Sequence, residues 1–269
     1  DYGNAGEIKE ARALYEALVD LSEAHPQEAA LREPRAKAAT NLVVAHGRAG
    51  EIKEARALYE GLVALSEAYS QEAPLREQRA NAAFNLITDY GNAGEIEEAR
   101  ALYEALVDLS EAHPQEAVLR EPRARAVNNL VLAYGDAGEI EEARALYDAL
   151  VSLSEAHPQG LAVREQRANA AFNLITDYGR AGEIGEAWTL YEALVDLWKA
   201  YPHEAALLDP RARAAFNLLY ASVQYGHPET AVRAYEGLID LSNRFPDDRA
   251  VRQMLERVRQ TFNVVESEE

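Results

Sequence analysis

The chain has 269 residues, with 46 acidic against 27 basic side chains and a formal net charge of -19. We expect neither a nucleic-acid nor a membrane partner, because both require a dense basic surface. Cysteine is absent, which excludes disulfides, thiolate metal sites and cysteine nucleophiles.

One glycine recurs every 44 residues along the whole sequence, at Gly6, Gly50, Gly94, Gly138, Gly182 and Gly226. A period between about 20 and 50 residues is typical of arrays of small stacked units. The chain opens inside this pattern, because Asp1-Tyr2-Gly3 repeats residues 89–91. We therefore expect the natural N-terminus to lie upstream.

Residues 7–24 have apolar side chains at helical spacing and are predicted to form the second helix of an incomplete unit. Proline follows this segment at Pro26 and at most of its counterparts, where a helix cannot continue. The next helix is predicted to start near Pro34, Gln78, Pro122, Gln166 and Pro210. Whether residues 116–120 and their copies add a helical turn upstream stays open. The repeated glycine then ends that helix with a left-handed cap.

The final helix is predicted over residues 248–264, with Val251, Met254, Leu255, Val258 and Phe262 covering the last hairpin. A terminal helix with a polar outer face is what a repeat array needs at its end. We predict an all-α fold, a right-handed α-solenoid of stacked antiparallel helix hairpins with about 12 helices. It forms one array over 1–269, with a partial unit at 1–33, repeats at 34–77, 78–121, 122–165, 166–209 and 210–246, and a cap and tail at 247–269.

The hairpins carry a small-large pattern of Leu86, Tyr90, Gly94, Ala99 and Tyr103, which recurs in phase along the chain. In this the chain resembles the tetratricopeptide repeat (TPR) superfamily. Its 44-residue repeat exceeds the usual period of about 34, so it is similar to the longer TPR-like variants.

The resemblance implies that the first helix of each hairpin lines a concave, peptide-binding face. Further outward positions on these helices are Thr40, Val44, Arg48, Thr88, Asn92, Asn128, Leu132, Asp136, Thr176, Arg180 and Tyr220. The peptide-binding candidates are Lys37, Asn41, Asn81, Phe84, Asn85, Arg125, Asn129, Asn169, Phe172, Asn173, Arg213, Phe216 and Asn217.

Asparagine occupies one position of this face in all five units, at Asn41, Asn85, Asn129, Asn173 and Asn217. A side-chain amide both donates and accepts, so the row could bind a peptide backbone, or each amide could bond to a neighbouring helix. The phenylalanines could anchor a ligand or pack between first helices. The cations Lys37, Arg125 and Arg213 resemble the carboxylate-holding side chains of some family members, or form a solvated face.

The first segment lacks a preceding helix to cover Leu14, Tyr15, Leu18 and Val19. We expect this surface to mediate self-association. The histidines are spaced along the array, and the residues show neither a metal site nor a catalytic set. We predict no enzyme activity and no cofactor.

Two functions remain open. The first is a non-catalytic scaffold that binds an extended peptide or partner segment in the concave groove. The second is a sensor or oligomerisation segment of a larger bacterial signalling protein. The sequence has neither a signal peptide nor an apolar run long enough to cross a bilayer, and we predict a cytoplasmic protein.

Overall fold

A computed structural model describes residues 5–262 of the chain. Within that range all regular structure is helical, as twelve α-helices and three short 3-10 turns. The predicted all-α class and the number of helices are therefore confirmed. The handedness of the array stays a prediction.

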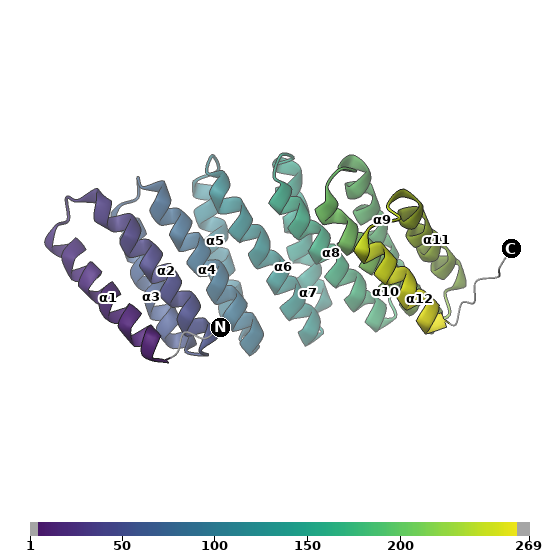
Figure 1. Ribbon diagram of the computed structural model, residues 1–269, viewed down its shortest axis with the longest axis horizontal. Coiled ribbons are helices and arrows are strands. Elements are labelled where there is room, and N and C mark those ends of the chain that lie inside the picture. The colour runs from purple at the N-terminus through teal and green to yellow at the C-terminus, as the bar shows by residue number, and fades with distance from the viewer. Residues whose placement is uncertain (1–4, 263–269) are drawn as a thin grey trace. The chain divides into compact units, whose positions relative to one another are not determined.

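The chain divides into two compact units, residues 1–133 and 134–269, with the division inside helix α6. Within each unit, successive helices alternate in direction and lie side by side (Figure 1). The first unit contains α1 (Ala5–Ala24), α2 (Arg32–Arg48), α3 (Ile52–Ala68), α4 (Ala73–Ala93), α5 (Ile96–Ala112) and most of α6 (Arg120–Ala137). The second contains α7 (Ile140–Ala156), α8 (Leu161–Ala181), α9 (Ile184–Ala200), α10 (Leu208–Gln224), α11 (Pro228–Arg244) and α12 (Arg249–Phe262).

The turn between the helices of each hairpin follows the sequence prediction. Gly94 ends α4 in the left-handed conformation, with φ of 76°. The amide of Glu95 then donates to the carbonyl of Tyr90, which completes the cap. Glycine supplies this conformation without the steric cost that a side chain would add.

Two first helices start earlier than the residues near which the sequence placed them, because the upstream turn that the sequence left open is helical in these units. Helices α4 and α8 begin at Ala73 and Leu161, five residues before Gln78 and Gln166. In the other units a 3-10 turn, such as Ala29–Leu31, precedes an α-helix that starts two residues before the proline. Proline has no amide hydrogen to donate to the carbonyl four residues earlier, so Pro34 prevents a continuous α-helix through that turn, whereas Gln78 allows one.

The core of each unit lies between first and second helices. Leu86 on α4 and Leu106 on α5 are buried, and Ala99 on α5 is fully buried. In the second unit α10 packs against α8, α9, α11 and α12. The polar-backed final helix is confirmed over Arg249–Phe262, with Val251, Met254 and Val258 buried, while Leu255 and Phe262 are half-buried. The predicted residues 263 and 264 lie outside the described residues.

Candidate functional site: the first-helix face

The predicted binding residues lie on the first helices α2, α4, α6, α8 and α10. In the first unit, Lys37, Asn41 and Arg125 are exposed, whereas Asn81, Phe84, Asn85 and Asn129 are half-buried. In the second unit, Arg213 is exposed, and Asn169, Phe172, Asn173, Phe216 and Asn217 are half-buried. The structure therefore leaves part of every predicted side chain accessible.

Arginine from one first helix stacks on phenylalanine from the preceding one. The guanidinium of Arg125 lies 4.1 Å from the ring centroid of Phe84. Arg213 and Phe172 repeat this contact at 4.1 Å in the second unit. Such a cation–π contact covers one face of each ring, so these phenylalanines pack between first helices, which was one of the two readings of the sequence.

The row of asparagines is not chemically uniform. Asn129 donates to the Thr88 hydroxyl at 2.7 Å, and Asn217 donates to the Thr176 hydroxyl at 2.8 Å. Asn85 instead donates to the carbonyl of Asn81 on its own helix at 2.7 Å. The reading in which the amide bonds to a neighbouring helix therefore holds for Asn129 and Asn217.

Lys37 is occupied by a local ion pair, because its ammonium group lies 2.6 Å from the Glu33 carboxylate one helical turn earlier. This hydrogen bond and the attached charge raise the pKa of Lys37. A pair this exposed is weak, so a ligand carboxylate could compete for the lysine.

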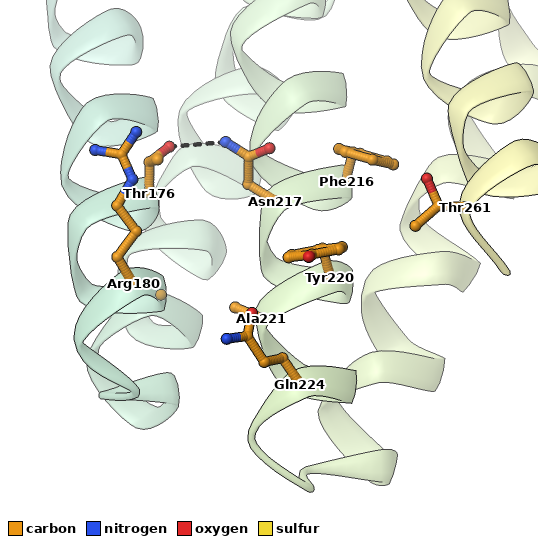
Figure 2. A pocket seen from close by; sticks show the side chains of 9 residues that line it. Thr176, Arg180, Phe216, Asn217, Tyr220, Ala221, Gln224 and Thr261 are labelled. Atoms are coloured by element: carbon orange, nitrogen blue, oxygen red, sulfur yellow. Dashed lines mark hydrogen bonds between the residues drawn. The ribbon is translucent and has the colours of Figure 1, made fainter.

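A pocket of about 320 Å³ lies on the first-helix face of the second unit, between α8, α10 and α12 (Figure 2). Phe216 projects from α10 toward Thr261 of α12, Tyr220 lies one turn further along α10, and the hydrogen bond from Asn217 to Thr176 crosses between α10 and α8. The remaining lining residues are Gly179, Arg180, Ala221 and Gln224. The pocket thus combines an aromatic floor with amide, hydroxyl and guanidinium groups.

Four pocket residues, Gly179, Ala221, Gln224 and Thr261, were not among the outward positions identified from the sequence. Gln224 occupies the place of Arg180 one period later, so strict repeat counting would have found it. Thr261 lies on α12, outside the repeat pattern, and the only available signal was its position next to Phe262 on an amphipathic helix.

Asp177 follows the pocket residue Thr176 on α8, and its carboxylate faces Gly135 on α6. Asp177 is 6% exposed, and its Oδ1 accepts from the Arg180 guanidinium at 3.2 Å. Burial raises the pKa of Asp177 to about 6, against the opposing effect of Arg180. Burial likewise raises the pKa of Asp89, its counterpart on α4, to about 6.

A second cavity of about 260 Å³ lies between α10, α11 and α12 and is almost entirely apolar. Its lining includes Val223 and Val232, which are 51% and 56% exposed. This cavity lies where α12 covers the last hairpin only in part.

The predicted self-association surface on α1 is unevenly exposed. Leu14 is 74% exposed, whereas Tyr15, Leu18 and Val19 are half-buried. The residues at the position of Leu14 in later repeats, such as Leu58 and Leu102, are 7% and 2% exposed.

Among residues 5–262, no three His, Cys, Asp or Glu side chains are grouped as a metal site would require. None of the helices in this described part is sufficiently long and apolar to cross a membrane.

Comparison with known proteins bears on the hairpins themselves. The tetratricopeptide repeat family matches residues 35–69 and 123–157, two segments that start 88 residues apart. The crystal structure of BtubC (BKLC) from P. vanneervenii aligns with 100% of this chain and 96% of its own, with a TM-score of 0.61 and 17% identity. The matched segments are two of the helix hairpins, and the chain has a TPR-like fold. The likeness to BtubC, at that identity, shows the fold alone.

A second solved structure, MamA MSR-1 C2, covers 78% of this TPR-like chain and 98% of its own, at 19% identity and a TM-score of 0.38. That score is too low to support an inference. No curated protein sequence matches the chain. TPR-like folds are generally non-catalytic and generally mediate contacts between proteins, which supports an interaction scaffold in broad terms.

Proposed function

We propose that this TPR-like chain is a non-catalytic scaffold that binds an extended peptide along its first helices. The observation that carries the proposal is the pocket between α8, α10 and α12, because residues predicted from the sequence, Phe216 and Asn217, line it. Tyr220, also in the lining, is 49% exposed. Tyrosine is among the residue types enriched in binding hot spots, and this side chain is accessible to a partner.

The polar groups of the pocket suit a peptide backbone. Asn217 uses its amide nitrogen on Thr176, and a side-chain amide retains a carbonyl oxygen that can accept from a ligand. Gln224 is exposed at the end of α10 and offers both donor and acceptor groups. The net charge of -19 favours a protein or peptide partner over nucleic acid or an anionic membrane.

This proposal is tested by panning a phage-displayed random peptide library on the whole chain and measuring the Kd of the selected peptides. Tyr220→Ala should weaken binding about tenfold or more, the loss typical of a hot-spot aromatic residue. Gln224→Ala should weaken it by a smaller factor. Thr189→Ala, at an exposed position on α9, should leave the Kd unchanged. Peptides that bind wild type and Tyr220→Ala equally well would refute this site.

A second function, self-association through α1, is favoured by the exposure of Leu14. Its counterparts in later repeats, such as Leu58 and Leu102, are buried, and an exposed apolar surface gains free energy when a partner covers it. Tyr15, Leu18 and Val19 would extend the contact. Such self-association would suit an oligomerisation segment of a larger protein.

Sedimentation equilibrium over a range of protein concentrations tests the second function. Wild type should associate, and Leu14→Glu should shift the chain toward the monomer, because a buried carboxylate would lose its hydration. Leu132→Glu changes a leucine that is 48% exposed on α6 and serves as the matched control. Association that is equally strong in both variants would exclude the α1 surface.

A further inference from the structure

Two first helices each place an aspartate against a glycine of the preceding first helix. Asp89 on α4 faces Gly47 on α2, and Asp177 on α8 faces Gly135 on α6. A Cβ atom on Gly47 would lie 1.9 Å from Asp89 Oδ2, and one on Gly135 would lie 2.0 Å from Asp177 Oδ2. Each carboxylate therefore occupies the space that the side chain of any residue other than glycine would fill at position 47 or 135.

The neighbouring junctions lack this carboxylate. Ala133 stands opposite Gly91, and Ala221 stands opposite Gly179, with the added Cβ 3.6 Å and 3.1 Å from the alanine methyl. The aspartate thus occurs at alternate positions of the array. The alanine junctions show that the packing itself does not require a carboxylate.

The carboxylate of Asp177 is poorly solvated. Its Oδ2 is buried and has no hydrogen-bond partner. Oδ1 pairs with Arg180, whose side chain is 68% exposed and therefore gives limited stabilisation. A buried oxygen without a partner is expensive when it is charged and much less so when it carries a proton.

The charged groups around the two aspartates do not reverse the preference for the neutral carboxyl. Asp136, at the end of α6, adds negative charge near Asp177 and opposes the effect of Arg180. On the α7 side, Arg144 interacts with Tyr178, and on the α10 side Tyr225 donates to the Arg180 carbonyl at 2.7 Å. The charge that acts on Asp89 is Arg48 at the end of α2.

We propose that the two Asp–Gly contacts are protonation-controlled joints, at which neighbouring first helices pack closely when the aspartate is neutral and separate when it is charged. Ionisation of Asp177 requires water at its buried Oδ2, and water reaches that atom when the helices move apart. Asp89 is half-buried, and its carboxylate faces Gly47 in the same way. The carboxyl groups should change state near pH 6, the value to which burial raises the pKa of both.

The joint of the second unit lies on the same helix, α8, as two residues of the pocket. Thr176 and Arg180, which line the pocket, flank Asp177 on α8, so a movement of α8 at this joint would change the pocket. The joint does not depend on peptide binding, and either proposal can fail while the other stands.

The first measurement is a carbon-13 NMR titration of the aspartate carboxyls in the whole chain. Two carboxyls should titrate near pH 6, well above the ordinary aspartate range of about 3.9, and both signals should disappear in Asp89→Asn/Asp177→Asn. Ala221→Asp, which places a carboxyl opposite Gly179, should add a third elevated titration. Titration of Asp89 and Asp177 near pH 4 would overturn the proposal.

The second measurement detects the movement. Because the chain has no cysteine, nitroxide labels can be attached at Ala137→Cys and Ala181→Cys, both exposed, on α6 and α8. Their mean separation, measured by electron spin resonance, should lengthen between pH 5 and pH 7 and stay constant in the Asp177→Asn background. Ala49→Cys and Ala93→Cys report on the Asp89 joint in the same way. A constant distance in wild type, or an equal change in the asparagine variant, would refute the joint even if the carboxyl titrates near pH 6.

Discussion

Each of two buried arginines forms an ion pair with one glutamate of the next repeat. Arg76 is 6% exposed and its Nε donates to both oxygens of Glu116, at 3.1 Å and 3.0 Å, while Nη1 donates to the carbonyl of Ser70. Arg164 repeats this arrangement with Glu204 and Pro158. Charge-assisted, two-pronged pairs of this kind fix relative orientation as well as adding energy. The residue 40 positions after Arg120 is Gly160, so this arginine has no carboxylate at the equivalent place.

We expect Arg76→Ala to lower the free energy of unfolding by about 3–5 kcal/mol, because it leaves the Glu116 carboxylate buried without its partner. Arg120→Ala is the matched control. Its guanidinium donates to the Pro114 carbonyl at 2.7 Å in an exposed setting, and its loss should cost at most about 1 kcal/mol. Urea denaturation measures both, and equal losses would show that the Glu116 pair adds nothing.

Replacing Asp177 with alanine should stabilise the chain at neutral pH. The folded pKa of about 6 exceeds the unfolded value of about 3.9, so the folded state binds more protons between these values. The contribution of Asp177 to the free energy of unfolding of the wild type is therefore fully present below about pH 4, and it is lost as the pH rises through 6. Asp177→Ala should raise the free energy of unfolding by about 1–3 kcal/mol at pH 7.5, with the gain vanishing near pH 4. If the increase in the free energy of unfolding did not depend on pH, it would arise from packing and not from the ionisation of Asp177.

At the scale of the helix, replacement of glycine by alanine should have opposite effects on stability at two positions with similar surroundings. Neither Gly94 nor Gly185 has an atom within 4 Å of an added Cβ. Gly94 has a φ of 76°, so Gly94→Ala should destabilise by about 1–2 kcal/mol through backbone strain. Gly185 lies inside α9, and Gly185→Ala should stabilise by about 0.5–1 kcal/mol. Thermal unfolding followed by circular dichroism separates the two, and a stabilising Gly94→Ala would contradict the left-handed cap.

The sequence was informative about elements and less so about contacts between them. Helical periodicity and the recurring glycine predicted the hairpins because both depend on residues a few positions apart. The early start of α4 was left open because it depends on the absence of proline at Gln78, several residues inside the helix. The stack of Arg125 on Phe84 and the bond from Asn129 to Thr88 join residues about 41 positions apart. Repeat counting places such residues on one face, but side-chain geometry decides whether they bind each other or a ligand.

At the scale of the whole molecule, a repeat array derives its stability from contacts between neighbours, and its ends need separate protection. Helix α12 provides that protection in the second unit. It presents Val251, Met254 and Val258 to the last hairpin and exposes charged side chains such as Arg252 on the other side. Its cover is partial, since the apolar cavity beside Val232 remains open.

We therefore expect a chain that ends at residue 248 to unfold at a lower urea concentration in its second unit and to bind the dye ANS, because the apolar surface under α12 becomes exposed. Met254→Ala, at a residue that is 4% exposed, should reproduce part of the effect and cost about 2–5 kcal/mol. Arg252→Ala/Gln260→Ala alters only exposed positions of the same helix and should change stability by less than about 0.5 kcal/mol. If the shortened chain kept the wild-type midpoint and bound no dye, α12 would be dispensable, and the final hairpin would have to be stable with its outer face open to water.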